Sequence, residues 1–312
     1  MLEVPSSPRT VATLLAATMA VQAVLGLVLH EQYRDVAWIK ATWLGNDWVT
    51  LVLAVPLLAA ALAFTRRGQG RGENGAARGE IGSSRGEIGS VRGQLLGLGV
   101  LGYGAYNYAF YLFGAALNVF FPLYVVAFVL SVVGLILALA RTRPIDVAAR
   151  FVDTTAVSTR EGQGGRKRPG IRERAVGGYL VFVASGLAAV WAGFWAAYVF
   201  WGRPTPVEPE AFKLVAALDL SLMVPALAAG GILLWRRHPW GYVVAAIAGI
   251  QGTLYLIVLS VNSVLAIAKG LAQAPGELPL WGTLGVGTLA ATLALLAGAA
   301  DGKHARLRAD DR

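Results

Sequence analysis

Apolar residues dominate eight segments of the chain, each about as long as the hydrocarbon core of a bilayer is thick. The segments cover approximately residues 11–29, 48–65, 94–117, 119–140, 177–201, 212–235, 240–265 and 280–300. A membrane-crossing helix needs about 20 mainly apolar residues, because a backbone polar group without a partner is too costly in lipid. The pattern therefore predicts an all-α integral membrane protein with eight transmembrane helices.

The composition supports this interpretation, because the charged residues are few and gathered. Hydrophobic residues make up 56% of the chain and charged residues 14%, against roughly 25% charged in an ordinary soluble domain. Most of the charges lie in 66–93, 141–176 and 301–312. A soluble globular domain is therefore excluded. The chain has no cysteine, which also excludes disulfide bonds and thiolate metal sites.

Lysine and arginine gather on one side of the predicted membrane. Of the 27 lysines and arginines, 22 lie on this side: Arg9, those in 66–93 and 141–176, Arg236 with Arg237, and those in the tail. Short loops rich in positive charge stay in the cytoplasm. We therefore expect a multi-pass protein of the plasma membrane with both termini cytoplasmic. Its basic loops are expected to meet anionic lipid headgroups, and no nucleic-acid partner is expected.

The second half of the sequence resembles the first. Residues 55–67, which begin Val-Pro-Leu-Leu and end Arg-Arg, align with residues 224–237, which begin Val-Pro-Ala-Leu and also end Arg-Arg. The pattern predicts two tandem four-helix repeats in the same orientation. The first covers 1–140 with a flexible cytoplasmic linker at 66–93, and the second covers 177–300. A basic cytoplasmic connector, 141–176, joins them, and 301–312 forms a cytoplasmic tail. Shared richness in alanine, leucine and glycine is the alternative explanation.

Polar side chains inside the spans supply the candidate ligand site. They are spaced at the helical period in the third and seventh spans, Asp219 lies inside the sixth span, and Asp47 stands at the outer start of the second. The candidates are Asp219, Tyr103, Asn107, Tyr111, Gln251, Tyr255 and Asp47. Intramembrane carboxylates are rare and are often functional. We expect Asp219 to face Tyr103, Asn107, Gln251 and Tyr255 in a polar pocket open to the outer face.

Two structural alternatives stay open for these residues. The tyrosines and amides could hydrogen-bond neighbouring helices and only fix the packing. Asp219 could be the N-cap of a helix that starts at the interface. Asp47 stands at the outer start of the second span and corresponds by the proline register to position 216, one turn from Asp219.

Motifs for catalysis, cofactors and metals are weak. Gly97-Leu-Gly-Val-Leu-Gly102 matches the dinucleotide-binding string, but it lies inside a span, where small residues favour helix packing. The three histidines fall at span ends or in the tail, on different sides of the predicted membrane. We therefore expect no catalytic residue, no cofactor and no metal site.

Residues 235–242, Trp-Arg-Arg-His-Pro-Trp-Gly-Tyr, and 106–111, Tyr-Asn-Tyr-Ala-Phe-Tyr, resemble segments of uncharacterised multi-pass membrane proteins from prokaryotes. That resemblance implies a membrane location and no particular activity. The leading hypothesis is a small-molecule or ion transporter with a polar site between the two repeats. A non-catalytic sensor, assembly factor or partner subunit is the alternative, and a membrane-embedded lipid-acting enzyme is the third. The substrate and the oligomeric state do not follow from the sequence.

Overall fold

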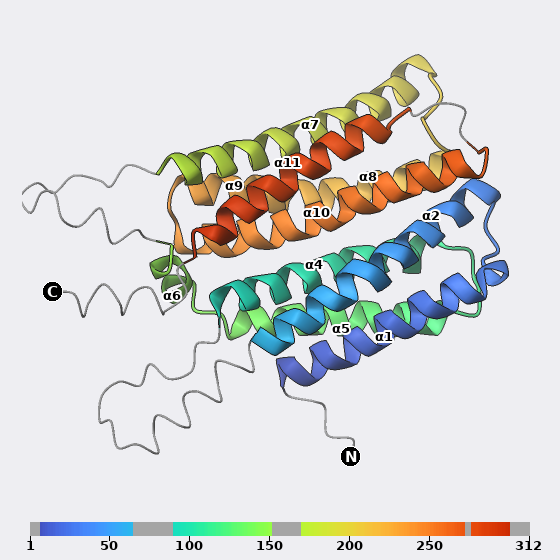
Figure 1. Ribbon diagram of the computed structural model, residues 1–312. Helices are drawn as coiled ribbons and strands as arrows, with labels where there is room; N and C mark the ends of the chain where they lie inside the picture. Colours follow the sequence, from blue (N-terminus) through green and yellow to red (C-terminus); the bar gives the residue numbers. More distant parts are fainter. Residues whose placement is uncertain (1–6, 65–89, 152–169, 272–275, 300–312) are drawn as a thin grey trace, which may run out of the picture.

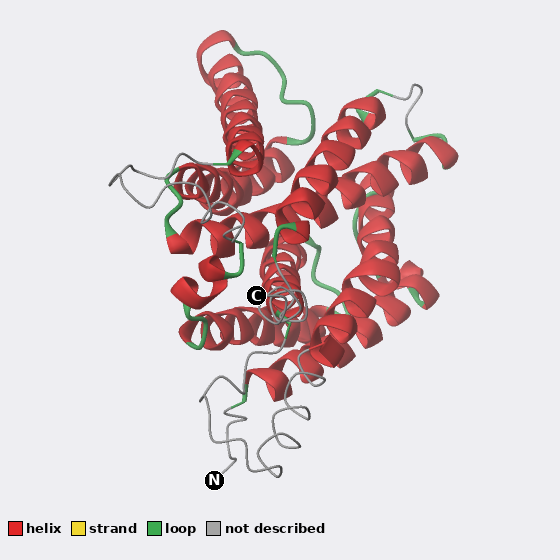
Figure 2. Ribbon diagram, turned by 60° about the vertical axis from the view of Figure 1, so that its left-hand side comes forward, coloured by secondary structure: helices red, strands yellow, loops and turns green. Residues whose placement is uncertain are grey.

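Long helices lie side by side in the computed structural model, and the chain passes repeatedly between the two ends of the bundle (Figure 1). The structure describes residues 7–64, 90–151, 170–271 and 276–299. Within these ranges every regular element is helical (Figure 2). The tail 301–312, nearly all of the linker 66–93 and half of the connector 141–176 lie outside them. The main helices are α1 (Pro8–Val28), α2 (Ala37–Val49), α4 (Val91–Gly114), α5 (Phe121–Ala140), α7 (Ile171–Trp201), α8 (Pro209–Leu218), α9 (Val224–Trp235), α10 (Pro239–Ala268) and α11 (Leu278–Ala297).

Seven helices in the described residues are long and apolar enough to cross a membrane. They are α1, the continuous helix Ala37–Phe64, α5, α7, the continuous helix Pro209–Trp235, α10 and α11. This confirms the prediction of an all-helical chain with membrane-length helices. Helix α4 has 24 residues, but four tyrosines, one asparagine and six glycines reduce its hydropathy, and it is not among the seven.

The second helix begins at Ala37, well before the predicted start of the second span at residue 48. Its first turns carry polar residues that the hydropathy pattern assigned to an outer loop. The indole of Trp43 is nevertheless buried, and its Nε1 donates to the Asp35 carboxylate at 2.9 Å. Trp43 and Asp47 lie within the helix here because other parts of the chain cover them and supply their hydrogen bonds.

Two of the long helices contain a π-helical turn just before a proline. Thr50–Ala54 precedes Pro56, and Asp219–Met223 precedes Pro225. Proline has no N–H to donate, and its ring clashes with the carbonyl four residues earlier, so a wider turn relieves the clash. Thr50 and Asp219 therefore occupy the same place, six residues before the proline. Turns of this kind are frequent at functional sites.

Helices α4 and α10 form the centre of the bundle and pack directly on each other. Gly99 and Gly102 of α4 allow this close approach. A Cβ at Gly99 would lie 2.5 Å from Ile250 Cβ, and one at Gly102 would lie 3.0 Å from Gln251 Oε1. The glycine string 97–102 is thus part of a helix contact. One side of α4 faces α1 and α2, and the other faces α8 and α10.

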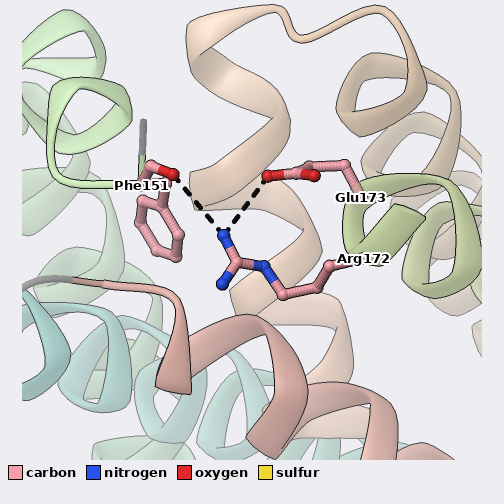
Figure 3. Close-up of polar contacts among 3 residues, drawn as sticks. All are labelled: Phe151, Arg172 and Glu173. Atoms are coloured by element: carbon pink, nitrogen blue, oxygen red, sulfur yellow. Dashed lines mark hydrogen bonds and ion pairs between the residues drawn. The ribbon is translucent and has the colours of Figure 1, made fainter. Parts of the chain in front are cut away.

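Arginines at one end of the bundle tie helix ends together. Arg172 Nη2 donates to the Phe151 carbonyl at 3.4 Å and lies 3.3 Å from Glu173 Oε1 (Figure 3). Arg92, at the start of α4, donates to carbonyls at the end of α11, including that of Ala299 at 2.8 Å. These contacts stabilise the end of the bundle where α4 and α7 begin.

Candidate functional site

Asp219 lies inside the continuous helix Pro209–Trp235, ten residues after its first residue. The side chain is fully buried. At about 1.5 Å per residue, the carboxylate is roughly 15 Å along the helix from its start. The N-cap position of this helix belongs to Glu208, so Asp219 does not cap a helix that begins at the interface.

Three neutral donors from three helices surround the Asp219 carboxylate. Tyr106 Oη of α4 donates to Oδ1 at 2.5 Å. On the other oxygen, Trp191 Nε1 of α7 donates to Oδ2 at 2.8 Å, and Tyr255 Oη of α10 donates to it at 3.4 Å. Hydrogen bonds to an ionised acceptor are about twice as strong as those between neutral groups. The site therefore joins α4, from the first half of the chain, to α7 and α10 from the second.

Asp47 forms a second buried carboxylate site, on the other side of α4. Its Oδ2 accepts from Tyr33 Oη at 2.6 Å, and its Oδ1 accepts from Tyr111 Oη at 2.8 Å and Gln22 Nε2 at 2.9 Å. These partners come from the segment between α1 and α2, from α4 and from α1. All four side chains are buried. The Asp47 carboxylate thereby connects three separate parts of the first half of the chain.

Further side chains extend the hydrogen-bond network around Asp47 and fill the space beside it. Tyr108 Oη donates to Gln22 Oε1 at 3.0 Å. Tyr33 belongs to the segment that connects α1 to α2. Its burial, and to a smaller extent the nearby Asp47 charge, raises the pKa of its hydroxyl, which therefore keeps its proton. A Cβ at Gly26 would lie 2.2 Å from Asp47 Oδ2, so only glycine leaves room for the carboxylate at this position.

The residues proposed from the sequence divide between these places. Tyr255 reaches Asp219 and Tyr111 reaches Asp47. The Tyr103 hydroxyl lies 3.3 Å from the Thr50 hydroxyl instead. Asn107 is buried, and its Nδ2 has no hydrogen-bond partner among the described residues. Gln251 packs against Gly102. The expected single pocket of Asp219 with Tyr103, Asn107, Gln251 and Tyr255 thus differs from the observed contacts.

Sequence reasoning missed several partners of the two carboxylates. Tyr106 lies beside the predicted stripe of α4, and Tyr108 lies further along the same helix. Gln22 carries the one side-chain amide of α1, which is a usable signal in a membrane-length helix. Trp191 and Tyr33 gave no sequence signal, because their positions depend on contacts between distant segments.

The chemistry of both sites is that of a carboxylate held by uncharged groups. In the described part of the chain, neither aspartate forms an ion pair with a lysine or arginine. Among the same residues, no group of three or more His, Asp or Glu side chains is placed to hold a metal ion. Each carboxylate is thus available as the negative partner of a proton or of a cationic ligand.

Comparisons with protein-family models, with curated protein sequences and with solved structures found no match.

Proposed function

We propose that this protein is a small-molecule or ion transporter whose binding site includes Asp219 and lies between the two halves of the chain. The observation that carries the proposal is the fully buried Asp219 carboxylate, which accepts hydrogen bonds from Tyr106 in the first half and from Trp191 and Tyr255 in the second. A charged side chain at the centre of a membrane helix costs about 2.5–3.5 kcal/mol on insertion scales and marks ligand or ion pathways.

The proposal includes eight spans, arranged as two four-helix repeats related by an axis along the membrane normal. Helix α4 is the additional span, since it is 24 residues long and packs between α5 and α10. Two observations support a repeat. The π-helical turns occupy the same register before Pro56 and Pro225. In the proposed repeat, α2 corresponds to α8 and α4 corresponds to α10. Helix α2 packs on α10, and α8 packs on α4, so each helix contacts the counterpart of the other's partner in the opposite half. Repeat interfaces commonly hold transport sites.

We place the protein in the plasma membrane with both termini in the cytoplasm. In the described residues, nine arginines lie at or beyond the helix ends where α1, α4 and α7 begin, and five lysines or arginines lie toward the opposite ends. Positive loops are retained in the cytoplasm and attract anionic headgroups. Reporter fusions after residues 93, 160, 238 and 312 test this orientation, and an outer signal at any of them contradicts it.

The absence of cysteine from the sequence permits a direct test of access to the site. Ala216 and Met223 lie one turn to either side of Asp219 on the same helix face, and both are buried. In a transporter, a membrane-impermeant thiol reagent labels Ala216→Cys in right-side-out vesicles and Met223→Cys in inverted vesicles. The cysteine-free chain is the background, Ala127→Cys in the core is the unreactive control, and Val36→Cys on an exposed loop is the reactive one.

Labelling from opposite sides means that water reaches Asp219 in alternation, which transport requires. If Val36→Cys reacts while neither Ala216→Cys nor Met223→Cys does so from either side, the transport proposal is wrong.

A non-catalytic sensor or partner subunit is the second candidate. The observation in its favour is that both carboxylates are fully buried and have internal donors, as in a static bundle. The same labelling experiment decides between the two functions, because a static bundle leaves both cysteines unreactive.

A further inference from the structure

We propose that the ligand of Asp219 is an organic cation, such as a substituted ammonium, and that it reaches the carboxylate beneath the outer half of α7. This inference rests on the proposed function, for which it supplies the chemical class of the substrate. The evidence is that aromatic side chains surround Asp219 and that residues 185–201 of α7, which cover one side of it, contain no buried residue.

Every side chain that donates to Asp219 is aromatic. The Tyr106 and Tyr255 rings meet edge to face with centroids 5.1 Å apart. On the other side, the Trp191 ring meets Phe212 at 5.3 Å. A cation is attracted both to a carboxylate and to the faces of aromatic rings, and aromatic cages are a common device for binding ammonium groups. The site therefore offers both attractions at one place.

Other ligand classes fit these residues less well. An anion would be repelled by the carboxylate, which has no neighbouring lysine or arginine in the described residues to offset it. Calcium and magnesium require about six or more oxygen ligands. Among the described residues, no group of three or more His, Asp or Glu side chains is placed to supply them. A bulky organic cation needs no such oxygen shell.

The wall formed by α7 is the part of the site with the fewest buried residues. All buried residues of α7 lie between Glu173 and Ala184, and none lies in 185–201. Trp191 belongs to this second part, and Gly186 and Gly193 on either side of it face open space. Helix α7 runs along the edge of the bundle (Figure 1). A movement of residues 185–201 away from α8 would break the Trp191 hydrogen bond and expose Asp219 Oδ2.

Asp47 lacks this route, although it is also surrounded by aromatic side chains. Its partners Gln22, Tyr33 and Tyr111 are all buried, and Gly26 leaves no more space than the carboxylate fills. The organic cation is therefore assigned to Asp219 alone.

The test is binding of radiolabelled tetraphenylphosphonium to the purified full chain in detergent, with unlabelled compound as competitor. We expect saturable binding by the wild type and binding about tenfold or more weaker in Asp219→Asn. The matched controls are Tyr103→Phe and Tyr106→Phe, which each remove one buried hydroxyl of α4. Tyr103 contacts Thr50, so its variant should bind normally, whereas Tyr106→Phe should change the affinity.

A second pair of variants keeps the test valid if Asp219→Asn fails to fold. Tyr255→Phe keeps the ring but loses the hydroxyl that donates to Asp219, and Tyr255→Leu loses both. Tyr255→Leu should therefore bind about three- to thirtyfold more weakly than Tyr255→Phe. Equal binding by these two variants, unchanged binding in a folded Asp219→Asn, or no saturable binding by the wild type would each overturn the proposal.

Proteoliposomes separate this proposal from the proposed function. This lipophilic cation crosses bilayers unaided, so uptake is compared with that into protein-free liposomes. Saturable binding that depends on Asp219, with no uptake beyond that background, supports the cation site and contradicts transport. Uptake of a neutral or anionic compound, with no binding of the cation, supports transport and contradicts the substrate class.

Discussion

Each half of the chain contains one aspartate that is fully buried inside a long helix, and the surroundings of these two aspartates differ. Asp47 and Asp219 each lie ten residues after the first residue of a continuous helix, and both are fully buried. The partners of Asp47 are themselves buried and belong to segments of the first half. One partner of Asp219, Trp191, belongs to a helix segment without buried residues.

This difference indicates that two equally buried carboxylates can have different roles in one bundle. Donors on firmly packed segments hold a carboxylate in place and stabilise the fold. A donor on a loosely packed segment can leave, and a ligand can then replace it. We therefore expect Asp47 to contribute mainly to stability and Asp219 mainly to binding.

The largest expected effect is that of Asp47→Ala. The change leaves the Tyr33, Tyr111 and Gln22 donors buried without their acceptor, and we expect a loss of roughly 3–5 kcal/mol in the free energy of unfolding. Asp219→Ala should cost less, because one of its three donors, Trp191, is only partly buried and lies on residues 185–201 of α7, none of which is buried. Unfolding in detergent, followed by loss of monodisperse protein on heating, measures both. Equal losses would contradict the comparison.

Gly26→Ala should have the next largest effect. Its Cβ would lie 2.2 Å from Asp47 Oδ2 and 2.4 Å from Tyr33 Oη, so the site must shift, at a cost of about 1–3 kcal/mol. Gly186→Ala, in residues 185–201 of α7, is the control, because nothing lies within 4 Å of its Cβ. It should be neutral or stabilising by about 0.5–1 kcal/mol. The same heating assay distinguishes them, and a destabilised Gly186→Ala would mean that this segment is closely packed.

Trp191→Phe should lower stability by only about 1 kcal/mol while changing access to the site. The variant keeps an aromatic ring but loses the N–H donor to Asp219 Oδ2, while Tyr106 and Tyr255 still donate to the carboxylate. We expect faster thiol labelling of Ala216→Cys in this background. Trp43→Phe, which removes the bond to Asp35 on the other side of the bundle, is the matched control and should leave that labelling rate unchanged. An equal increase in both backgrounds would mean general loosening.

The smallest expected effect on the Asp219 site is that of Thr50→Val. Thr50 occupies the register position of Asp219, but its hydroxyl only pairs with that of Tyr103. We expect a loss of about 0.5–1.5 kcal/mol in stability and no change in cation binding. Loss of binding would show that the two π-helical turns form one functional unit, which would remove the distinction between the halves.

The sequence was sufficient to locate the helices, because about 20 apolar residues in succession have few alternatives to a membrane helix. It also identified Asp47 and Asp219 as unusual. It placed the start of the second helix too late, since hydropathy counts polar residues such as Lys40 and Asp47 as loop even where other segments cover them. It did not pair the tyrosines correctly with the two aspartates, because the pairing depends on which helices flank α4.

The amino-acid sequence by itself determined that the chain forms helices long and apolar enough to cross a bilayer, and where prolines lie within them. Only the tertiary structure decided what surrounds each carboxylate. Tyr103 and Tyr106 are three residues apart, so they point only about 60° apart around α4. That angle is enough to send the Tyr103 hydroxyl to Thr50 and the Tyr106 hydroxyl to Asp219, because α4 lies between the two halves. The spacing of residues along the chain defines which side chains share a face of a helix, but the packing of distant segments decides which helix that face contacts.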